Sequence, residues 1–292
     1  MRRGSLRQSP NERTVFLHYS PKILTNVIAI AMPEPIVQVK VHDHVGTIVL
    51  NRPDRRNAIT RQMLADLLQA FEDLHGQRKV RAVVLTGAGS AFSAGMDLSE
   101  MLETSKADNA LAMWHHDAVA YRDVVECMLR FPKPIIAAVN GPAVAGGAGL
   151  VLAADVVVAG NSAKFGLPEP LRGLVAGLVS PLLAFRVGGG LSAYLLLTAE
   201  ILEAEEAKAR GIYHELVPVD LVWARAAEIA GQCARCAPEA LQLTKKMLNE
   251  TIGEHLSTLL SAGAAASATA RTTEAAAEGL AAFLEKREPV WP

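Results

Sequence analysis

The spacing of apolar residues changes twice within the first third of the chain. Residues 36–41 and 45–50 are two β-rich runs separated by a short polar segment, which predicts a β-hairpin. From Thr60 to about His75 the apolar residues recur at helical spacing, and threonine is a good residue with which to cap a helix. The apolar positions of this predicted helix are Met63, Leu64, Leu67, Leu68 and Phe71.

Short apolar runs then alternate with glycine-rich segments and helical patterns. Residues 80–85, 135–139 and 156–159 each form a continuous apolar run of the length expected for a buried strand. A small-residue turn at 141–149 precedes a helical pattern at 150–154. This order of strand, glycine turn and helix predicts an α/β fold.

The β signal fades beyond Gly188, where Ala- and Leu-rich helices are predicted to the C-terminus. The small residues of 262–270 suit close helix packing or a subunit interface. We therefore predict three parts: a poorly ordered extension at 1–34, an α/β core at 35–225 and a helical region at 226–292. The extension lacks the long apolar core of a signal peptide.

The composition of the chain argues against several functional classes of protein. A net charge of -1 argues against a general nucleic-acid or anionic-membrane binder, which would need a strong basic excess. No apolar run reaches the length of about 20 residues that spans a bilayer. Three cysteines cannot form a disulfide framework, so we expect reduced thiols and a cytoplasmic location. Cys233 and Cys236 form a lone CxxC in a helix-like stretch, which favours a structural role over metal or redox chemistry.

Two loops rich in small residues are the strongest chemical signal. Residues 91–98 and 141–147 each follow a predicted strand, and glycines let a backbone approach a ligand closely. Backbone amides that lead into a helix N-terminus point outward as anion donors. Two such turns can converge on a single oxygen atom.

Five motifs occur in order along the chain: Asn51-Arg52-Pro53, Asn57-Ala58, Phe92-Ser93-Ala94-Gly95-Met96-Asp97-Leu98, Gly141 to Gly147, and Phe165-Gly166-Leu167-Pro168-Glu169. In order and spacing they resemble the enoyl-CoA hydratase/isomerase (crotonase) family, over about residues 36–291. The C-terminal Phe283–Arg287 is similar to that family's ending.

The resemblance implies an oxyanion hole and a catalytic carboxylate. By matching position, the backbone amides of Met96 and Gly146 would bind the thioester oxygen of an acyl-CoA, which gains negative charge during proton transfer at the neighbouring carbons. Glu169 matches one of the two glutamates that hydratases of this family use. The other position is Gly149, which has no side chain to carry a proton.

That departure leaves two activities open. Water addition is helped by two carboxylates, one activating water and one protonating the α carbon. A single carboxylate suffices to shift a double bond, and can also hydrate less efficiently. A non-catalytic acyl-CoA binder is a third reading, against which the retained Glu169 argues.

The resemblance also implies contacts with the substrate. Ala94 would contact the adenine, Arg52 and Arg56 would lie near the phosphates, and Phe283 and Lys286 would lie near the nucleotide, in the same or a neighbouring subunit. The complete set of predicted substrate-binding residues is Arg52, Arg56, Ala58, Ala94, Asp97, Leu98, Gly149, Pro168, Gly177, Phe283 and Lys286.

A long polar stretch, residues 99–130, is predicted to be irregularly helical and by resemblance covers the acyl pocket. Five of its side chains are candidates to replace the missing acid. They are His115, His116, Asp117, Tyr121 and Asp123. Because neighbouring residues on a helix face different directions, only some can point inward. We interpret them as a solvated face.

The sequence gives less support to other mechanistic classes. A serine hydrolase would use Ser93, but its segment misses the first glycine of the GxSxG elbow; Asp155 with His214 or His255 would have to complete a triad. No GxGxxG with an acidic ribose reader and no P-loop is present. His42 and His44 share a strand face without further metal ligands in the sequence.

The sequence thus predicts a crotonase-like spiral of ββα units with a helical C-terminal oligomerisation region. The resemblance implies a homotrimer or hexamer that binds an acyl-CoA thioester without metal or redox cofactor, coenzyme A being part of the substrate. It further implies enoyl-CoA hydratase or enoyl-CoA isomerase activity. No nucleic-acid or membrane partner is expected.

Overall fold

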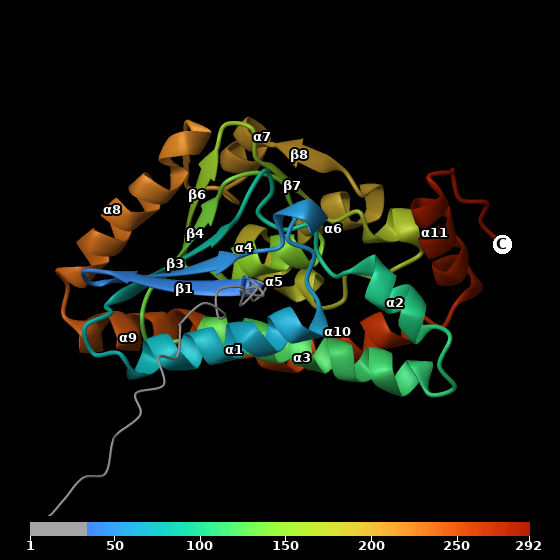
Figure 1. Ribbon diagram of the computed structural model, residues 1–292, viewed down its shortest axis with the longest axis horizontal. Coiled ribbons are helices and arrows are strands. Elements are labelled where there is room, and N and C mark those ends of the chain that lie inside the picture. The colour runs from blue at the N-terminus through green and yellow to red at the C-terminus, as the bar shows by residue number, and fades with distance from the viewer. Residues whose placement is uncertain (1–33) are drawn as a thin grey trace, which may run out of the picture. The chain divides into compact units, whose positions relative to one another are not determined.

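A six-stranded sheet organises the part of the chain that the computed structural model describes, residues 34–292 (Figure 1). Its strand order is β1-β2-β3-β4-β6-β9; β1 and β2 are antiparallel and every other neighbouring pair is parallel. The strands are β1 (Val37–His42), β2 (Val45–Leu50), β3 (Ala82–Gly87), β4 (Ile135–Val139), β6 (Val156–Gly160) and β9 (Glu215–Val217). The hairpin and the three buried strands expected from the sequence are therefore present.

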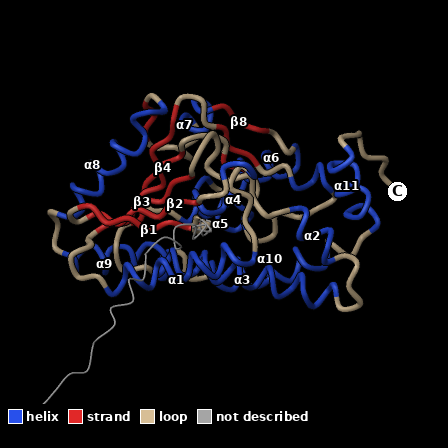
Figure 2. The backbone as a smooth tube through the Cα atoms, viewed as in Figure 1, coloured by secondary structure: helices blue, strands red, loops and turns tan. Residues whose placement is uncertain are grey.

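The alternation of side chains along each strand divides the core into two layers. Val83 and Leu85 belong to the larger apolar cluster, which includes residues of α1 (Arg61–Gly76) and α3 (Ala110–Arg130). Val84, between them, faces the opposite way and belongs to a second cluster with α8 (Val222–Ala234). Such alternation follows from the two-residue period of a strand. Figure 2 shows the strands gathered between α8 and the long helices.

The helix α1 begins where the sequence predicts. Thr60 is its N-cap, and its Oγ1 accepts a hydrogen bond of 3.1 Å from the backbone N–H of Met63. Met63, Leu67 and Phe71 are fully buried on the face that meets the sheet.

A small second sheet supports the region after β4. It consists of β5 (Ala143–Val144), β7 (Lys164–Gly166) and β8 (Ile201–Glu203), and β7 pairs parallel with β5 and antiparallel with β8. The helix α4 (Gly146–Ala153) follows β5 directly and is buried on all sides. The other helices are α2 (Leu98–Thr104), α5 (Val179–Val187), α6 (Gly189–Thr198), α7 (Ala204–Ala209), α9 (Pro238–Lys246), α10 (Leu256–Ala270) and α11 (Glu274–Glu285).

Three details differ from the sequence-based expectation. α4 begins at Gly146 and not at 150, because its glycines lie within the helix and allow it to be enclosed completely. β3 begins at Ala82 and not at 80. β8 and β9, each of three residues, lie beyond Gly188 where only helices are expected, since so short a strand has no detectable periodicity.

The C-terminal helices themselves are confirmed. Within the chain, the small residues of α10 permit close packing: a Cβ on Gly263 would overlap the carbonyl of Gly177. Pro35–Pro292 form one compact unit, so the division at 225/226 stays a prediction. The predicted extension falls almost wholly on residues 1–33, which lie outside the described residues.

Candidate functional site

The two small-residue loops meet side by side. Ser93 and Ala143 form a parallel β-bridge, and the backbone N–H of Val144 donates to the carbonyl of Ser93 at 3.1 Å. Gly95 has φ +83, and a Cβ there would lie 3.0 Å from the backbone nitrogen of Gly146. Only glycine therefore allows the loops to approach this closely. The motifs that are separate in sequence form one surface in the structure.

The amides of Met96 and Gly146 lie next to each other on this surface. Ile59 donates to the carbonyl of Gly95 and accepts from the N–H of Asp97, so the intervening N–H of Met96 points away from Ile59. The backbone nitrogen of Met96 is 3.6 Å from the position that a Cβ on Gly146 would occupy. Gly146 is the first residue of α4, where an N–H has no partner in its own helix. Both residues line the same cavity.

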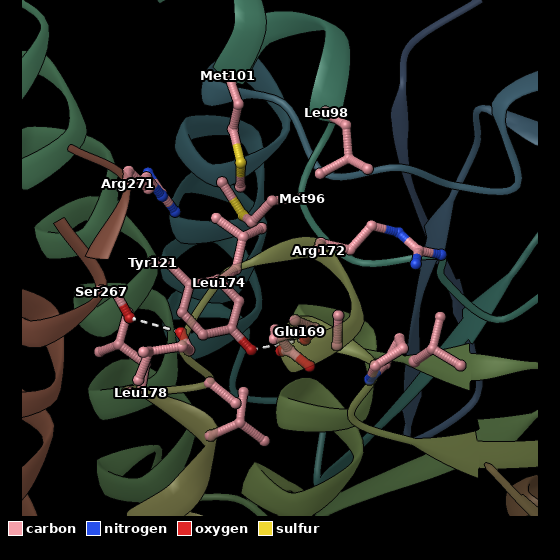
Figure 3. A pocket seen from close by; sticks show the side chains of 18 of the residues that line it. Met96, Leu98, Met101, Tyr121, Glu169, Arg172, Leu174, Leu178, Ser267 and Arg271 are labelled. Carbon is pink, nitrogen blue, oxygen red and sulfur yellow. Dashed lines mark hydrogen bonds between the residues drawn. The ribbon is translucent and has the colours of Figure 1, made fainter. Parts of the chain in front are cut away.

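That cavity has a volume of about 240 Å³ and a mainly apolar wall (Figure 3). Met96, Met101, Leu174 and Leu178 form much of the apolar part. The ionisable or hydroxyl-bearing residues that line it are Arg56, Asp117, Tyr121, Glu169, Arg172, Ser267 and Arg271. An apolar cavity with few polar groups is typical of a small-molecule site.

Glu169 is one of the two carboxylates that line this cavity, the other being Asp117. Glu169 begins a 3-10 turn, Glu169–Arg172, directly after Pro168. One carboxylate oxygen, Oε2, is buried and has no hydrogen-bond partner among residues 34–292. Burial raises the pKa of Glu169 to about 7, against smaller opposing effects from its own backbone N–H and from Arg172. The group therefore populates both protonation states at neutral pH, as a group that takes and returns a proton requires.

Tyr121 fills the space into which a side chain at position 149 would extend. A Cβ added at Gly149 would overlap the Tyr121 hydroxyl oxygen, and Val179 lies 3.0 Å from the same position. The hydroxyl donates a hydrogen bond of 2.6 Å to the carbonyl of Gly146. Burial, and the negative charge of Glu169, raise the pKa of Tyr121, so it stays a protonated donor.

The interpretation of residues 115–123 as a solvated face is wrong for two of them. Asp117 and Tyr121 are 5% and 3% exposed and line the cavity. They are four residues apart on α3 and thus share its inner face, whereas His115 and His116 point to solvent. The expectation that only some of these neighbouring residues can point inward agrees with this arrangement.

The predicted substrate-binding residues separate into two groups. Those that line the cavity are Arg56, Ala94, Leu98, Pro168, Gly177 and Phe283. Arg52, Ala58 and Asp97 instead form a brace behind the first loop: Arg52 Nη1 is 3.0 Å from Asp97 Oδ2 and donates to the carbonyl of Ala58 at 2.6 Å. Gly149 lies behind Tyr121, and Lys286 is exposed just after α11.

Ser93 has the surroundings of a structural residue. It is fully buried, its hydroxyl donates to the carbonyl of Asn57 at 2.8 Å, and the N–H of Gly95 donates to it. His214 Nδ1 accepts from the N–H of Val157, and Asp155 pairs with Lys245. The parts of a Ser-His-Asp triad are thus engaged elsewhere.

Two residues of the cavity, Arg172 and Arg271, were not singled out from the sequence. Arg172 stacks over the ring of Phe283, with 4.2 Å between its guanidinium carbon and the ring centroid. Arg271 is 9% exposed, and within the described part of the chain its Nη1 has no hydrogen-bond partner. The signal available for Arg271 was its charge at the end of the small-residue segment 262–270, which is otherwise uncharged.

Neither metal ligation nor a membrane span is indicated in the described region. Within residues 34–292, no group of three His, Cys, Asp or Glu side chains is arranged to hold a metal ion. Over the same residues, no helix combines the length and apolar character needed to cross a bilayer.

Comparisons with known proteins agree with one another. The family model described as enoyl-CoA hydratase/isomerase matches residues 40–292. A Thermus thermophilus protein provisionally named enoyl-CoA hydratase is 43% identical over 254 residues, covering 87% of this chain and 99% of that protein. The 2,3-dehydroadipyl-CoA hydratase of Escherichia coli is 34% identical, covering 86% of this chain and 96% of that protein. A solved enoyl-CoA hydratase/isomerase structure from Xanthobacter autotrophicus matches with TM-score 0.79 and 29% identity, covering 87% of this chain and 97% of that one.

Proposed function

We propose that this chain, which belongs to the enoyl-CoA hydratase/isomerase family, shifts the double bond of an enoyl-CoA with Glu169 as its single proton carrier. Membership of the family, expected from five sequence motifs, is confirmed, and with it an enzyme that acts on enoyl-CoA as a hydratase or an isomerase. The assignment of roles to individual residues is our proposal.

The proposed reaction begins with the thioester oxygen bound by the amides of Met96 and Gly146. Glu169 removes a proton from the α carbon of a 3-enoyl-CoA, and the electron pair moves onto the thioester oxygen. The two N–H groups stabilise this charge, and loss of one such donor typically costs about 2.7 to 4 kcal/mol of barrier. The dienolate then collapses, and its γ carbon takes the same proton back from Glu169. Atoms and electrons balance without water or a co-reactant.

The observation that carries the proposal is the occupation of the second carboxylate's place by Tyr121. No side chain fits at Gly149 while the Tyr121 hydroxyl donates to Gly146. Glu169, with a pKa raised to about 7 and one oxygen unpaired, has the properties of a base that also serves as the acid.

Hydration is the second candidate, because the compared relatives from Thermus thermophilus and Escherichia coli are named hydratases. In that case Glu169 would activate water and then supply the proton alone. The Tyr121 hydroxyl is engaged with Gly146, so it would not replace the second carboxylate without breaking that bond.

We assign the mouth of the cavity to coenzyme A. Arg56 and Arg172 supply positive charge there, and the half-exposed Phe283 ring offers a surface for stacking. We further propose that coenzyme A, as part of the substrate, is the only organic cofactor moiety involved, that the enzyme works as a homotrimer or hexamer, and that it resides in the cytoplasm, where its three cysteines stay reduced.

The decisive experiment compares two substrates with two proteins. Wild type and Glu169→Gln are assayed with a 3-enoyl-CoA for isomerisation and with crotonyl-CoA for hydration. We expect isomerisation to be the faster reaction in wild type, and Glu169→Gln to lose roughly 100- to 10,000-fold in kcat. Faster hydration than isomerisation in wild type would establish the hydratase alternative. Binding of acyl-CoA without turnover of either substrate would leave only a binding role.

A further inference from the structure

At the buried end of the cavity, the carboxylate of Asp117 is already bound by Arg61 and does not hydrogen-bond the guanidinium of Arg271. Asp117 is bound in two places by Arg61, with 2.6 Å from Nε to Oδ1 and 2.8 Å from Nη2 to Oδ2. Arg271 lies near this pair, and its buried Nη1 has no hydrogen-bond partner among the residues that the structure describes. Arg61, Asp117 and Arg271 together carry a net charge of about +1. Glu100 acts on Arg61 and accepts a hydrogen bond from its backbone N–H, so the group that is left without a partner in the described region is the Arg271 guanidinium.

Arg271 keeps this charge at neutral pH. Burial lowers the pKa of Arg271 to about 10; Asp117 opposes this effect and Arg61 adds to it. The guanidinium is still protonated well above pH 7. A charged group that is more than nine-tenths buried and unpaired is unfavourable, unless a ligand supplies the opposite charge.

The position of Arg271 identifies which part of a ligand it would meet. Figure 3 shows Arg271 and Arg172 on opposite sides of the cavity, with Glu169 and Leu174 drawn between them. Arg172 stacks on the half-exposed Phe283, while Arg271 is enclosed. The two arginines thus belong to different ends of one binding site. The enclosed end is where the acyl group would extend away from its thioester.

We propose that the acyl group of the substrate ends in a second carboxylate and that Arg271 binds this carboxylate. The proposal rests on the proposed function, which places the thioester at Met96 and Gly146, and it names the substrate class of that site: the monothioester of an unsaturated dicarboxylic acid. Arginine binds a carboxylate through paired, charge-assisted hydrogen bonds. Asp117 does not repel this carboxylate effectively, because Arg61 already neutralises it.

The test uses pairs of 3-enoyl-CoA substrates of equal carbon number, one ending in a methyl group and the other in a carboxylate, over several chain lengths. For the length that fits, we expect wild type to favour the carboxylate by roughly 10- to 100-fold in kcat/KM. Arg271→Gln should bring that ratio to one or below, while Arg271→Lys retains part of it. Arg172→Gln, which removes the same charge at the other end, should lower both substrates alike and leave the ratio unchanged.

A binding measurement separates this proposal from the proposed function. Calorimetry with saturated thioesters, one ending in a methyl group and one in a carboxylate, measures binding affinity without any turnover. If wild type binds the carboxylate-ended thioester more tightly and Arg271→Gln does not, the proposal holds even when no isomerisation occurs. If wild type treats the two ends equally or favours methyl at every length, the proposal is overturned while isomerisation can stand. The wild-type comparison alone can overturn the proposal, and if Arg271→Gln misfolds, a reduced preference in Arg271→Lys supports the assignment while an unchanged preference overturns it.

Discussion

In the proposed mechanism the two walls of the cavity have different tasks, and they are built from different parts of the polypeptide. One wall consists of backbone amides from the loops that contain Met96 and Gly146, and we call it the backbone wall. The other consists of side chains from α3 and from the end of α10, including Tyr121 and Arg271, and we call it the side-chain wall. The first can stabilise charge on any thioester oxygen. The second can distinguish one acyl group from another.

The largest effect should follow from separating the loops of the backbone wall. In Gly95→Ala, the new Cβ would lie 2.7 Å from the Ala145 Cβ and 3.0 Å from the Gly146 nitrogen. We expect kcat to fall by roughly 100- to 1,000-fold, as when an oxyanion donor is lost. Gly188→Ala is the matched control: Gly188 has φ +81 but open space around it, so its variant should have backbone strain and near-normal kcat. Equal losses in both variants would contradict the assignment.

The pKa of Glu169, the proposed base, should determine how kcat/KM depends on pH. Because the pKa of Glu169 is raised to about 7 and the base must be ionised to act, kcat/KM should rise with pH and level off above 7. At pH 5 it should be roughly a hundredth of its plateau. Initial rates between pH 5 and 9 test this, with Glu169→Gln expected to be low and flat. A plateau that extends to pH 5 would remove Glu169 from the role of base.

Exchanging residues in the side-chain wall should change the reaction and not merely its rate. Gly149→Glu alone would collide with Tyr121, but Gly149→Glu combined with Tyr121→Ala makes room for a second carboxylate. We expect the double variant to hydrate crotonyl-CoA at least roughly tenfold faster than Tyr121→Ala alone. Hydration that does not increase in a folded double variant would show that the missing carboxylate is not what limits it.

The smallest effect concerns stability. The raised pKa of Glu169 means that the folded state holds its proton more tightly than the unfolded state, so this residue stabilises the fold below pH 4.5 and loses that contribution as pH rises through about 7. Relative to Glu169→Gln, wild type should lose up to about 3 kcal/mol of unfolding free energy between pH 5 and pH 8. Denaturant unfolding of both proteins at equal concentration measures the difference. A difference that is constant with pH would contradict the burial of an unpaired carboxylate.

The same contrast explains how much could be predicted from the sequence. The backbone wall could be predicted from the sequence because glycines at fixed spacing after β-rich runs constrain the backbone geometry locally, as at Gly95. The cap at Thr60 and the helix that it begins are local in the same sense. Such features need only a few neighbouring residues to be recognised.

The side-chain wall depends on contacts between distant segments. That Tyr121 stands over Gly149 follows from the packing of α3 on α4, and nothing near Tyr121 in the sequence indicates it. Asp117 was assigned to solvent because a carboxylate on a polar helix usually faces water; here Arg61 from α1 pairs with it. Arg271 becomes a candidate ligand-binding residue only because Arg61 pairs with Asp117 and leaves the Arg271 guanidinium without a partner in the described structure.

The last helix also has a bearing on how the enzyme matures. A Cβ on Gly173 would overlap the backbone of α11 at Ala275, and one on Gly279 would overlap the backbone of Arg172, so α11 packs tightly on the turn that carries Glu169. During translation this helix leaves the ribosome after all the other helices and strands of the fold. On the proposed mechanism, a nascent chain would therefore contain both amide donors before α11 emerges, and Glu169 would be held in position only once that helix has packed on its turn.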